Sequence, residues 1–314
     1  MSARTDPATL DIQAVGLTRS FGDHLAVDHL DLGVAPGELF SLLGPNGAGK
    51  TTTIKMLCGL LRPTSGTAIV RGFDITKHPL DVKRVIGVSP QETAVAPNLS
   101  ASENLRLMAG LHGIGDQRSR ARTEELLEVT GLTARAGDKA KHYSGGMQRR
   151  LSIAMALVSE PEVVFLDEPT IGLDPQARRG MWEYIAGLKG ETTIVLTTHY
   201  LEEADALADR IAVVDGGALV ALGTPSELKE RFAGTPMMVI ETPHISDDAL
   251  EALRARYPSA RPVVDGVEIE GEHVNVYDVG DCLRPFGVDI RSTSMRHATL
   301  DDVFLELTGK EVRE

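Results

Sequence analysis

Short apolar runs alternate with segments of helical period between residues 10 and 211 of this chain. Continuous apolar runs bounded by turn residues are typical of buried strands, whereas apolar positions three and four apart indicate amphipathic helices. Strands are expected at residues 39–43, 163–167 and 192–198. Helices are expected at residues 50–61, 101–113, 123–132, 175–188 and 200–209. Buried strands that alternate with helices predict an α/β core with a mostly parallel sheet.

Two early segments have a different pattern. Residues 10–22 and 24–34 alternate apolar and polar positions with period two, which indicates an antiparallel β piece added to the core. Residues 211–223 read as a hairpin around Gly216 and Gly217. The helix at residues 101–113 has Ser100 or Ser102 as its candidate N-cap.

The last quarter of the chain follows another plan. Residues 223–236 contain a helical segment in a connector, and residues 237–309 then read as strand, helix, strand, strand, helix and strand before a final helix. This order predicts a small α+β domain with its last strand at residues 288–294.

The composition of the chain limits the classes of partner that are expected. The 314-residue chain has a net charge of -13 and an isoelectric point near 5.2, so nucleic acid is not expected as a partner. Cys58 and Cys282 lack metal-ligand spacing and are expected to be reduced thiols. The sequence shows no targeting segment and no window approaching the ~18 apolar residues of a membrane span. If the protein works at a membrane, it is expected to do so from the water side.

A glycine-rich loop follows the first expected core strand. It reads GPNGAGKT and matches the pattern G-x4-G-K-[ST] between a strand and a helix. The glycines let backbone N–H groups wrap phosphates, Lys50 reaches the outer phosphates, and the Thr51 hydroxyl suits Mg²⁺. A plain glycine-rich turn is the alternative. The nucleotide-binding residues expected here are Gly44, Pro45, Asn46, Gly47, Ala48, Gly49, Lys50, Thr51 and Thr52.

Two acids end another expected strand, VVFLDE. Asp167 would lie at the strand tip beside Mg²⁺, and Glu168 could orient or deprotonate the attacking water. An apolar run ending in two acids is weak evidence alone, and a solvated strand end is the alternative. The preceding phosphate loop favours the functional interpretation.

Three further residues have ordinary alternatives. His199 follows the strand at residues 192–198 and could hydrogen-bond the γ-phosphate, although a histidine there is usually structural. Gln91 is unremarkable alone, since most glutamines are simply solvated. Phe21 could stack on a base or fill the core, and without a motif the core is favoured.

The segment SGGMQRRLSIAMALVSE begins a helix with two adjacent glycines, each costing about 1 kcal/mol relative to Ala. Ser144 and the unshielded N–H groups of the first turn would attract an anion. The alternative is a flexible turn before a core helix.

Together these segments resemble the nucleotide-binding subunits of ATP-binding-cassette (ABC) transporters. The resemblance covers most of Phe21 to Tyr200 and rests, in order, on GPNGAGKTT, Gln91, YSGGM, VVFLDEP, GLDP and TTHY. It implies a P-loop ABC-ATPase domain over residues 1–224 with a mostly parallel sheet, an antiparallel β subdomain and a helical subdomain at about 92–160. A linker at 225–235 and an accessory α+β domain at 236–314 are expected to follow.

The resemblance implies roles for the matching positions. Phe21 would stack on adenine, Glu168 would be the catalytic acid and His199 the switch histidine. Gln91 would contact Mg²⁺ or the attacking water and couple the site to a membrane partner. Signature and D-loop residues expected at the nucleotide are Ser144, Gly145, Gly146 and Asp174. The expected Mg²⁺ ligands are Thr51, Gln91 and Asp167.

In such subunits the signature of one copy contacts the ATP of another. The resemblance therefore implies a head-to-tail homodimer with two shared ATP sites, bound at the cytoplasmic face of the cell membrane to a separate integral membrane permease. Two positions depart from the commonest signature, Tyr143 in place of Leu and Met147 in place of Gln. Because Ser144 and the glycine N–H groups make the phosphate contact, both departures are expected to leave activity intact.

Other ATPases compete with this interpretation. A small-molecule kinase has no reason to carry the signature, the D-loop and His199 together. A chromosome or repair ATPase would insert a long coiled coil, and a translation factor of this superfamily would hold two cassettes. A non-transport ABC ATPase or a nucleotide-dependent regulator stays open. The ending ATLDDVFLELTGK resembles drug- and antibiotic-exporter subunits, which implies export of a drug-like or lipid-like compound.

Overall fold

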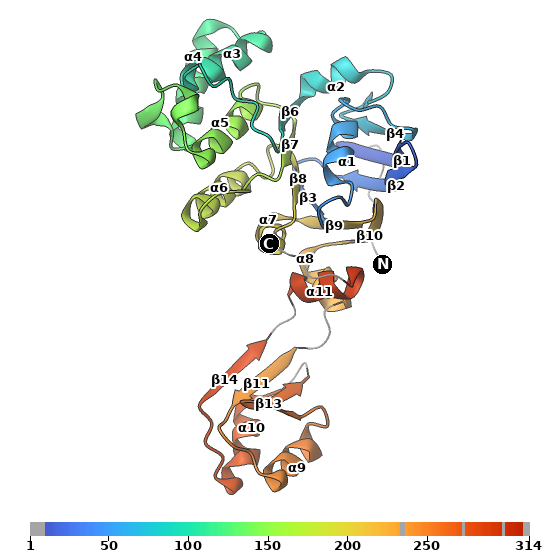
Figure 1. Ribbon diagram of the computed structural model, residues 1–314, viewed down its shortest axis with the longest axis vertical. Coiled ribbons are helices and arrows are strands. Elements are labelled where there is room, and N and C mark those ends of the chain that lie inside the picture. Colours follow the sequence, from blue (N-terminus) through green and yellow to red (C-terminus); the bar gives the residue numbers. More distant parts are fainter. Residues whose placement is uncertain (1–9, 233–235, 272–273, 297–298, 310–314) are drawn as a thin grey trace. The chain divides into compact units, whose positions relative to one another are not determined.

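A computed structural model describes residues 10–232, 236–271, 274–296 and 299–309 of the chain (Figure 1). The described residues form two compact units, one ending at Pro225 and the other beginning at Ser226. None of the helices in these ranges is long and apolar enough to cross a membrane.

A six-stranded sheet forms the centre of the first unit. Its order is β10-β9-β3-β8-β7-β6, and all neighbours are parallel except the β9–β10 hairpin. The strands are β3 (Leu39–Leu43), β6 (Ile86–Ser89), β7 (Val163–Asp167), β8 (Thr193–Thr198), β9 (Arg210–Asp215) and β10 (Ala218–Gly223). The predicted mostly parallel α/β core and the hairpin around Gly216 and Gly217 are confirmed.

The central strands are buried on both faces, which explains their continuous apolar runs. Every residue of β3, β7 and β8 is buried, and Phe40 and Phe165 lie fully inside the core. Their polar members therefore need partners within the sheet. Asp167 and Thr197 are two such residues, and both belong to the site described below.

A four-stranded antiparallel sheet of order β2-β1-β4-β5 belongs to the same unit. Its strands are β1 (Ile12–Phe21), β2 (His24–Val34), β4 (Ser65–Val70) and β5 (Phe73–Asp74). The β1–β2 pairing confirms the predicted antiparallel piece, and register shifts interrupt its alternation at three places. The strands at residues 65–74 were not predicted.

Seven α-helices within the described residues complete this unit. Ser100, one of the two expected N-caps, caps α3 in a capping box with Glu103. Helix α3 packs on both α4 and α5, and α5 also contacts β6 and β7. The helices are α1 (Lys50–Leu57), α2 (Pro79–Val85), α3 (Ala101–Leu111), α4 (Asp116–Val129), α5 (Gly145–Leu157), α6 (Pro175–Gly187) and α7 (Leu201–Leu207), with short 3-10 turns η2 (Thr133–Arg135) and η3 (Ala140–His142).

The second unit has the predicted α+β order. Its antiparallel sheet, β12-β13-β11-β14, shares a core with α9 and α10 that includes Ile240, Leu253, Val267 and Val279. The last strand was misplaced, because it lies at residues 292–296 instead of 288–294. The elements are α8 (Pro225–Phe232), β11 (Met237–Glu241), α9 (Asp247–Arg256), β12 (Arg261–Val263), β13 (Gly266–Glu270), α10 (Val276–Leu283), η4 (Arg284–Phe286), β14 (Ser292–Arg296) and α11 (Leu300–Thr308).

The predicted connector helix at residues 223–236 corresponds to α8, which lies at the start of the expected linker. Residues 233–235 of that linker lie outside the described residues.

Candidate functional site

The chemistry-bearing residues gather at one edge of the six-stranded sheet. The carboxyl ends of parallel strands meet at the same edge, where ligands of α/β proteins bind. The glycine loop follows β3, Asp167 ends β7, and Glu168 and His199 directly follow β7 and β8. Gln91 lies two residues beyond the end of β6.

The glycine loop leads into α1 with unshielded backbone. Gly49 precedes the helix with φ 98, and a Cβ there would lie 2.3 Å from the Ala26 carbonyl oxygen. A Cβ on Gly44 would lie 2.2 Å from the Val214 oxygen. A Cβ on Gly47 would meet nothing within 4 Å, so this side of the loop is open. The loop therefore offers N–H groups at a helix N-terminus to an anion.

Lys50 lies under this loop and is almost fully buried. Its Nζ donates to the Gly44 carbonyl at 2.6 Å and to the Pro45 carbonyl at 3.2 Å, and it lies 3.6 Å from Glu168 Oε1. Burial lowers the pKa of Lys50, while the nearby Glu168 carboxylate opposes that shift. A buried ammonium here is suited to phosphate oxygens.

A pocket of about 460 Å³ opens beside the loop. It has the size of a ligand site. Its lining brings together most of the residues predicted to bind nucleotide. The lining residues are Phe21, His24, Ala26, Asn46, Gly47, Ala48, Gly49, Lys50, Thr51, Thr52, Gln91 and Glu168.

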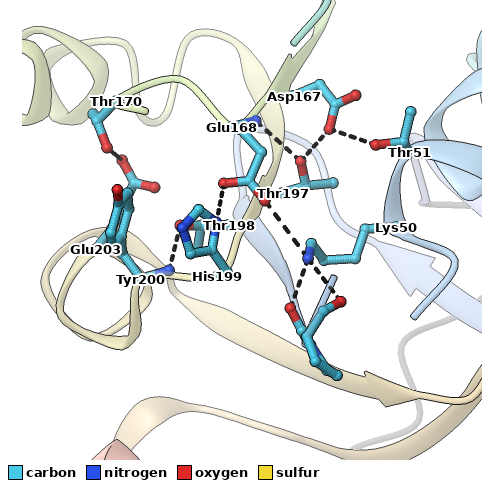
Figure 2. A network of polar contacts seen from close by, with 12 residues as sticks. Lys50, Thr51, Asp167, Glu168, Thr170, Thr197, Thr198, His199, Tyr200 and Glu203 are labelled. Carbon is cyan, nitrogen blue, oxygen red and sulfur yellow. Dashed lines mark hydrogen bonds and ion pairs between the residues drawn. The ribbon is translucent and has the colours of Figure 1, made fainter. Parts of the chain in front are cut away.

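Asp167 is buried at the tip of β7, between two hydroxyl groups. Its Oδ1 accepts from Thr197 Oγ1 at 2.5 Å and from Thr51 Oγ1 at 3.2 Å (Figure 2). A hydroxyl and a carboxylate are the hard oxygen ligands that Mg²⁺ prefers. Within the described ranges, no group of three or more His, Cys, Asp or Glu side chains is arranged to hold a metal ion by itself. The donor set therefore fits Mg²⁺ that also takes phosphate and water oxygens.

Glu168 links Lys50 to His199. Its Oε2 lies 2.7 Å from His199 Nδ1, and its other oxygen is the one near Lys50 (Figure 2). The backbone of Glu168 has φ 53, a left-handed conformation that is rare for residues other than glycine. Its N–H donates to the Thr197 carbonyl and to the Thr197 hydroxyl, both at 3.1 Å. The carboxylate is thereby held beside the loop that would carry the phosphates.

Phe21 and Gln91 lie at the mouth of the pocket. Phe21 ends β1 and is 46% exposed, with the Arg19 guanidinium carbon 4.5 Å from its ring centre. This exposure contradicts the alternative of a core-filling role. Gln91 is exposed and lines the pocket, so its side chain is available to a ligand.

The signature residues do not line that pocket. Ser144 is the N-cap of α5, where its Oγ accepts from Met147 N at 3.3 Å. Ser144 and Gly145 are exposed, so the helix N-terminus faces outward. Asp174 similarly caps α6, accepting from Ala177 N at 2.9 Å. The exposed N-terminus of α5 is therefore an anion-attracting surface outside the pocket beside the glycine loop.

Three buried polar residues near the site were not predicted. Thr197 donates to Asp167 and accepts from the Glu168 backbone N–H, Arg149 of α5 donates to backbone carbonyls around Glu168, and Glu203 of α7 accepts from Thr170 Oγ1 at 2.8 Å. Neither Arg149 nor Glu203 had a signal in the sequence, because Arg149 lies between Gln148 and Arg150 and Glu203 directly follows Glu202.

The fold and the strand-end pocket define a P-loop nucleotide-binding ATPase. The family model described as "ABC transporter" matches residues 27–171. The daunorubicin resistance ATP-binding protein DrrA3 of Streptomyces coeruleorubidus is 42% identical over 95% of this chain and 96% of that protein. The Nod factor export ATP-binding protein I of Cupriavidus metallidurans is 39% identical over 98% of this chain and 100% of that protein.

A solved dimeric ATP-binding cassette in a post-hydrolysis state with ADP and Pi is 26% identical, with a TM-score of 0.63 over 68% of this chain and 98% of that one. The chain belongs to the ABC transporter family, as a nucleotide-binding, ATP-hydrolysing subunit.

Replacing Met147 with Gln is expected to leave ATP turnover unchanged. Ser144 accepts from the backbone N–H at this position, so the side chain has no part in the cap. Steady-state phosphate release from both proteins measures the effect. An increase beyond about tenfold, ~1.4 kcal/mol of barrier, would contradict this expectation.

The free energy of unfolding is expected to depend on pH through the buried Glu203 carboxyl group. Burial raises its pKa above the ordinary value of 4.5, so its contribution to folding is full below that value and is lost as pH rises toward the folded-state pKa. Glu203→Gln does not titrate. The free energy of unfolding of Glu203→Gln should therefore rise relative to that of wild type as pH increases above 4.5, measured by urea titration. A difference between Glu203→Gln and wild type that stays constant with pH would refute the assignment.

Proposed function

We propose that this chain powers export of a drug-like or lipid-like compound through a separate membrane permease, by ATP-driven dimerisation. The observation that carries the proposal is the similarity over nearly the whole chain to subunits named for drug resistance and export. In that arrangement the subunit works peripherally, at the cytoplasmic face of the cell membrane. Residues 1–224 would form the ATPase domain and residues 236–314 the accessory domain.

The pocket beside the glycine loop would hold ATP with Mg²⁺. The loop N–H groups and Lys50 would bind the phosphates, and Phe21 would stack on adenine. Mg²⁺, held by Thr51, Asp167 and Gln91, would supply positive charge that offsets the charge of the phosphates. The exposed ring of Phe21 and the Thr51–Asp167 hydrogen bond support these assignments.

Hydrolysis would depend on Glu168. Its carboxylate accepts a proton from water as the water oxygen bonds to the γ-phosphorus and the bond to the ADP oxygen breaks. His199 would hold the γ-phosphate and also orient Glu168, which lies 2.7 Å from its ring nitrogen. When ATP binds, before hydrolysis, Lys50 would exchange its contact with Glu168 for contacts with phosphate oxygens.

The signature would act on the ATP of a second copy. Ser144, Gly145, Gly146 and the D-loop residue Asp174 would cap the partner copy's nucleotide in a head-to-tail homodimer. Support comes from the outward-facing N-terminus of α5, which lies apart from the pocket of its own chain. The Ser144 hydroxyl can accept from Met147 N and still donate its proton to a phosphate oxygen. Hydrolysis removes this shared ligand and loosens the dimer.

A transport assay tests the proposal. The subunit would be purified with its permease from native membranes and reconstituted in liposomes with the fluorescent drug daunorubicin. ATP should drive drug movement in wild type, and Glu168→Gln should abolish it. ATP hydrolysis by wild type without movement of daunorubicin or of a fluorescent lipid would refute export of this substrate class.

A further inference from the structure

Arg149 is a buried, positively charged residue that has no part in the nucleotide binding or hydrolysis proposed above. It lies on α5, five residues after Ser144, and only 2% of it is exposed. Its guanidinium makes four hydrogen bonds, all to backbone carbonyls: Pro169 at 3.1 Å, Gln91 at 3.2 Å, and Pro90 and Asp167. No ion pair of Arg149 occurs among the described residues. Burial lowers its pKa, so holding this cation inside the protein is costly.

The carbonyls that Arg149 binds surround the catalytic position. Asp167 and Pro169 are the two chain neighbours of Glu168, and Arg149 donates to both. Glu168 itself has the left-handed φ of 53. A residue with a side chain keeps such a conformation only where the surroundings fix it.

The other anchors of this turn come from different elements. Thr197 of β8 accepts from Glu168 N, and Glu203 of α7 accepts from Thr170 Oγ1 (Figure 2). Arg149 is the anchor from α5. Through its contacts with Pro90 and Gln91, it also ties the turn to the loop after β6.

We infer that Arg149 is a positioning residue that fixes the Glu168 turn and joins it to the signature helix and the Gln91 loop. The inference rests on the proposed function, in which the N-terminus of α5 meets the nucleotide of a second copy. If α5 shifts when it contacts that nucleotide, the Arg149 side chain would transmit the movement to the backbone on both sides of the chain's own Glu168. Binding at one site would thereby set the geometry of the acid at the other.

The test compares ATP turnover by the full-length wild type with that of Arg149→Lys and Arg149→Gln. A misplacement of about 1 Å lowers turnover by roughly 100-fold, so kcat should fall by about this factor in both variants. KM for ATP should stay within about twofold, because Arg149 does not contact the phosphate loop. Lysine keeps the charge but cannot reach four carbonyls, so its failure to restore kcat supports geometry over charge.

Arg150→Gln is the matched control. Arg150 is the next residue of α5 and donates to the Thr130 carbonyl at 2.7 Å, away from the Glu168 turn. Its loss should leave kcat within about twofold of wild type. Recovery of kcat in Arg149→Lys, an equal loss in Arg150→Gln, or a rise in KM that accounts for the defect would each overturn the inference.

Melting curves identify variants that do not fold. If Arg149→Gln is unfolded, Arg149→Lys alone decides the outcome. Failure of the proposed function is distinct, because wild type would then hydrolyse ATP without moving daunorubicin or a fluorescent lipid, while the kcat comparison of the Arg149 variants would be unaffected. Normal turnover in both Arg149 variants, with an inactive Glu168→Gln, would overturn this inference alone.

Discussion

Glu168→Gln is expected to lower ATP turnover by roughly 10²–10⁴-fold while ATP binding persists, since a positioned general base contributes about that factor. The glutamine amide cannot accept the water proton. It has the same size and shape as the carboxylate, whose Oε2 lies 2.7 Å from His199 Nδ1. Steady-state phosphate release measures turnover, and binding of a fluorescent ATP analogue measures affinity.

The matched control is Glu183→Gln, which removes an exposed carboxylate from α6. It should behave as wild type. The bound ATP of Glu168→Gln should also hold two copies together, which light scattering with and without ATP detects. Turnover by Glu168→Gln within a few-fold of wild type would assign the base to another residue.

Lys50→Met is expected to weaken nucleotide binding. Hydrogen bonds to a charged group are worth about 1.5–3 kcal/mol, which corresponds to roughly 10–150-fold in Kd. Lys50 is also the cation nearest to Glu168 Oε1, at 3.6 Å, so turnover of the residual bound ATP should fall as well. Equilibrium titration with a fluorescent ATP analogue measures the affinity.

Lys55→Met serves as its control, because Lys55 lies on the same helix α1 and is exposed. Its Kd should match that of wild type. An unchanged Kd in Lys50→Met would mean that the phosphates do not lie over the glycine loop.

The sequence predicted β3, β7 and β8 of the main sheet because these strands are buried on both faces and therefore read as unbroken apolar runs, but it missed the edge strand β6. Residues 62–99 gave no such signal. Strand β4 alternates irregularly between exposed and buried positions, and α2 has only seven residues. The last strand was misplaced for a related reason, because all five residues of β14 are exposed and carry no alternation.

The sequence predicted the site residues that come directly after buried strands. The glycine loop, Glu168 and His199 come directly after buried strands, so parallel topology brings them together. Arg149, Thr197 and Glu203 were missed because their partners lie on distant segments: backbone carbonyls for Arg149, the Asp167 carboxylate for Thr197 and the Thr170 hydroxyl for Glu203. Hydrogen bonds of this kind leave no spacing pattern in a sequence.

The Thr197 hydroxyl holds both the Asp167 carboxylate and the backbone of Glu168 from inside a strand. It donates to Asp167 and accepts from the Glu168 N–H, and β8 lies between β3 and β7 in the sheet. Central strands open only with the whole domain, whereas surface loops open locally at low cost. Gentle warming should therefore loosen the exposed residues of the pocket well before it breaks the hydrogen bonds of Thr197 to Asp167 and to the Glu168 backbone. Irreversible loss of hydrolysis on heating should coincide with melting of the central sheet.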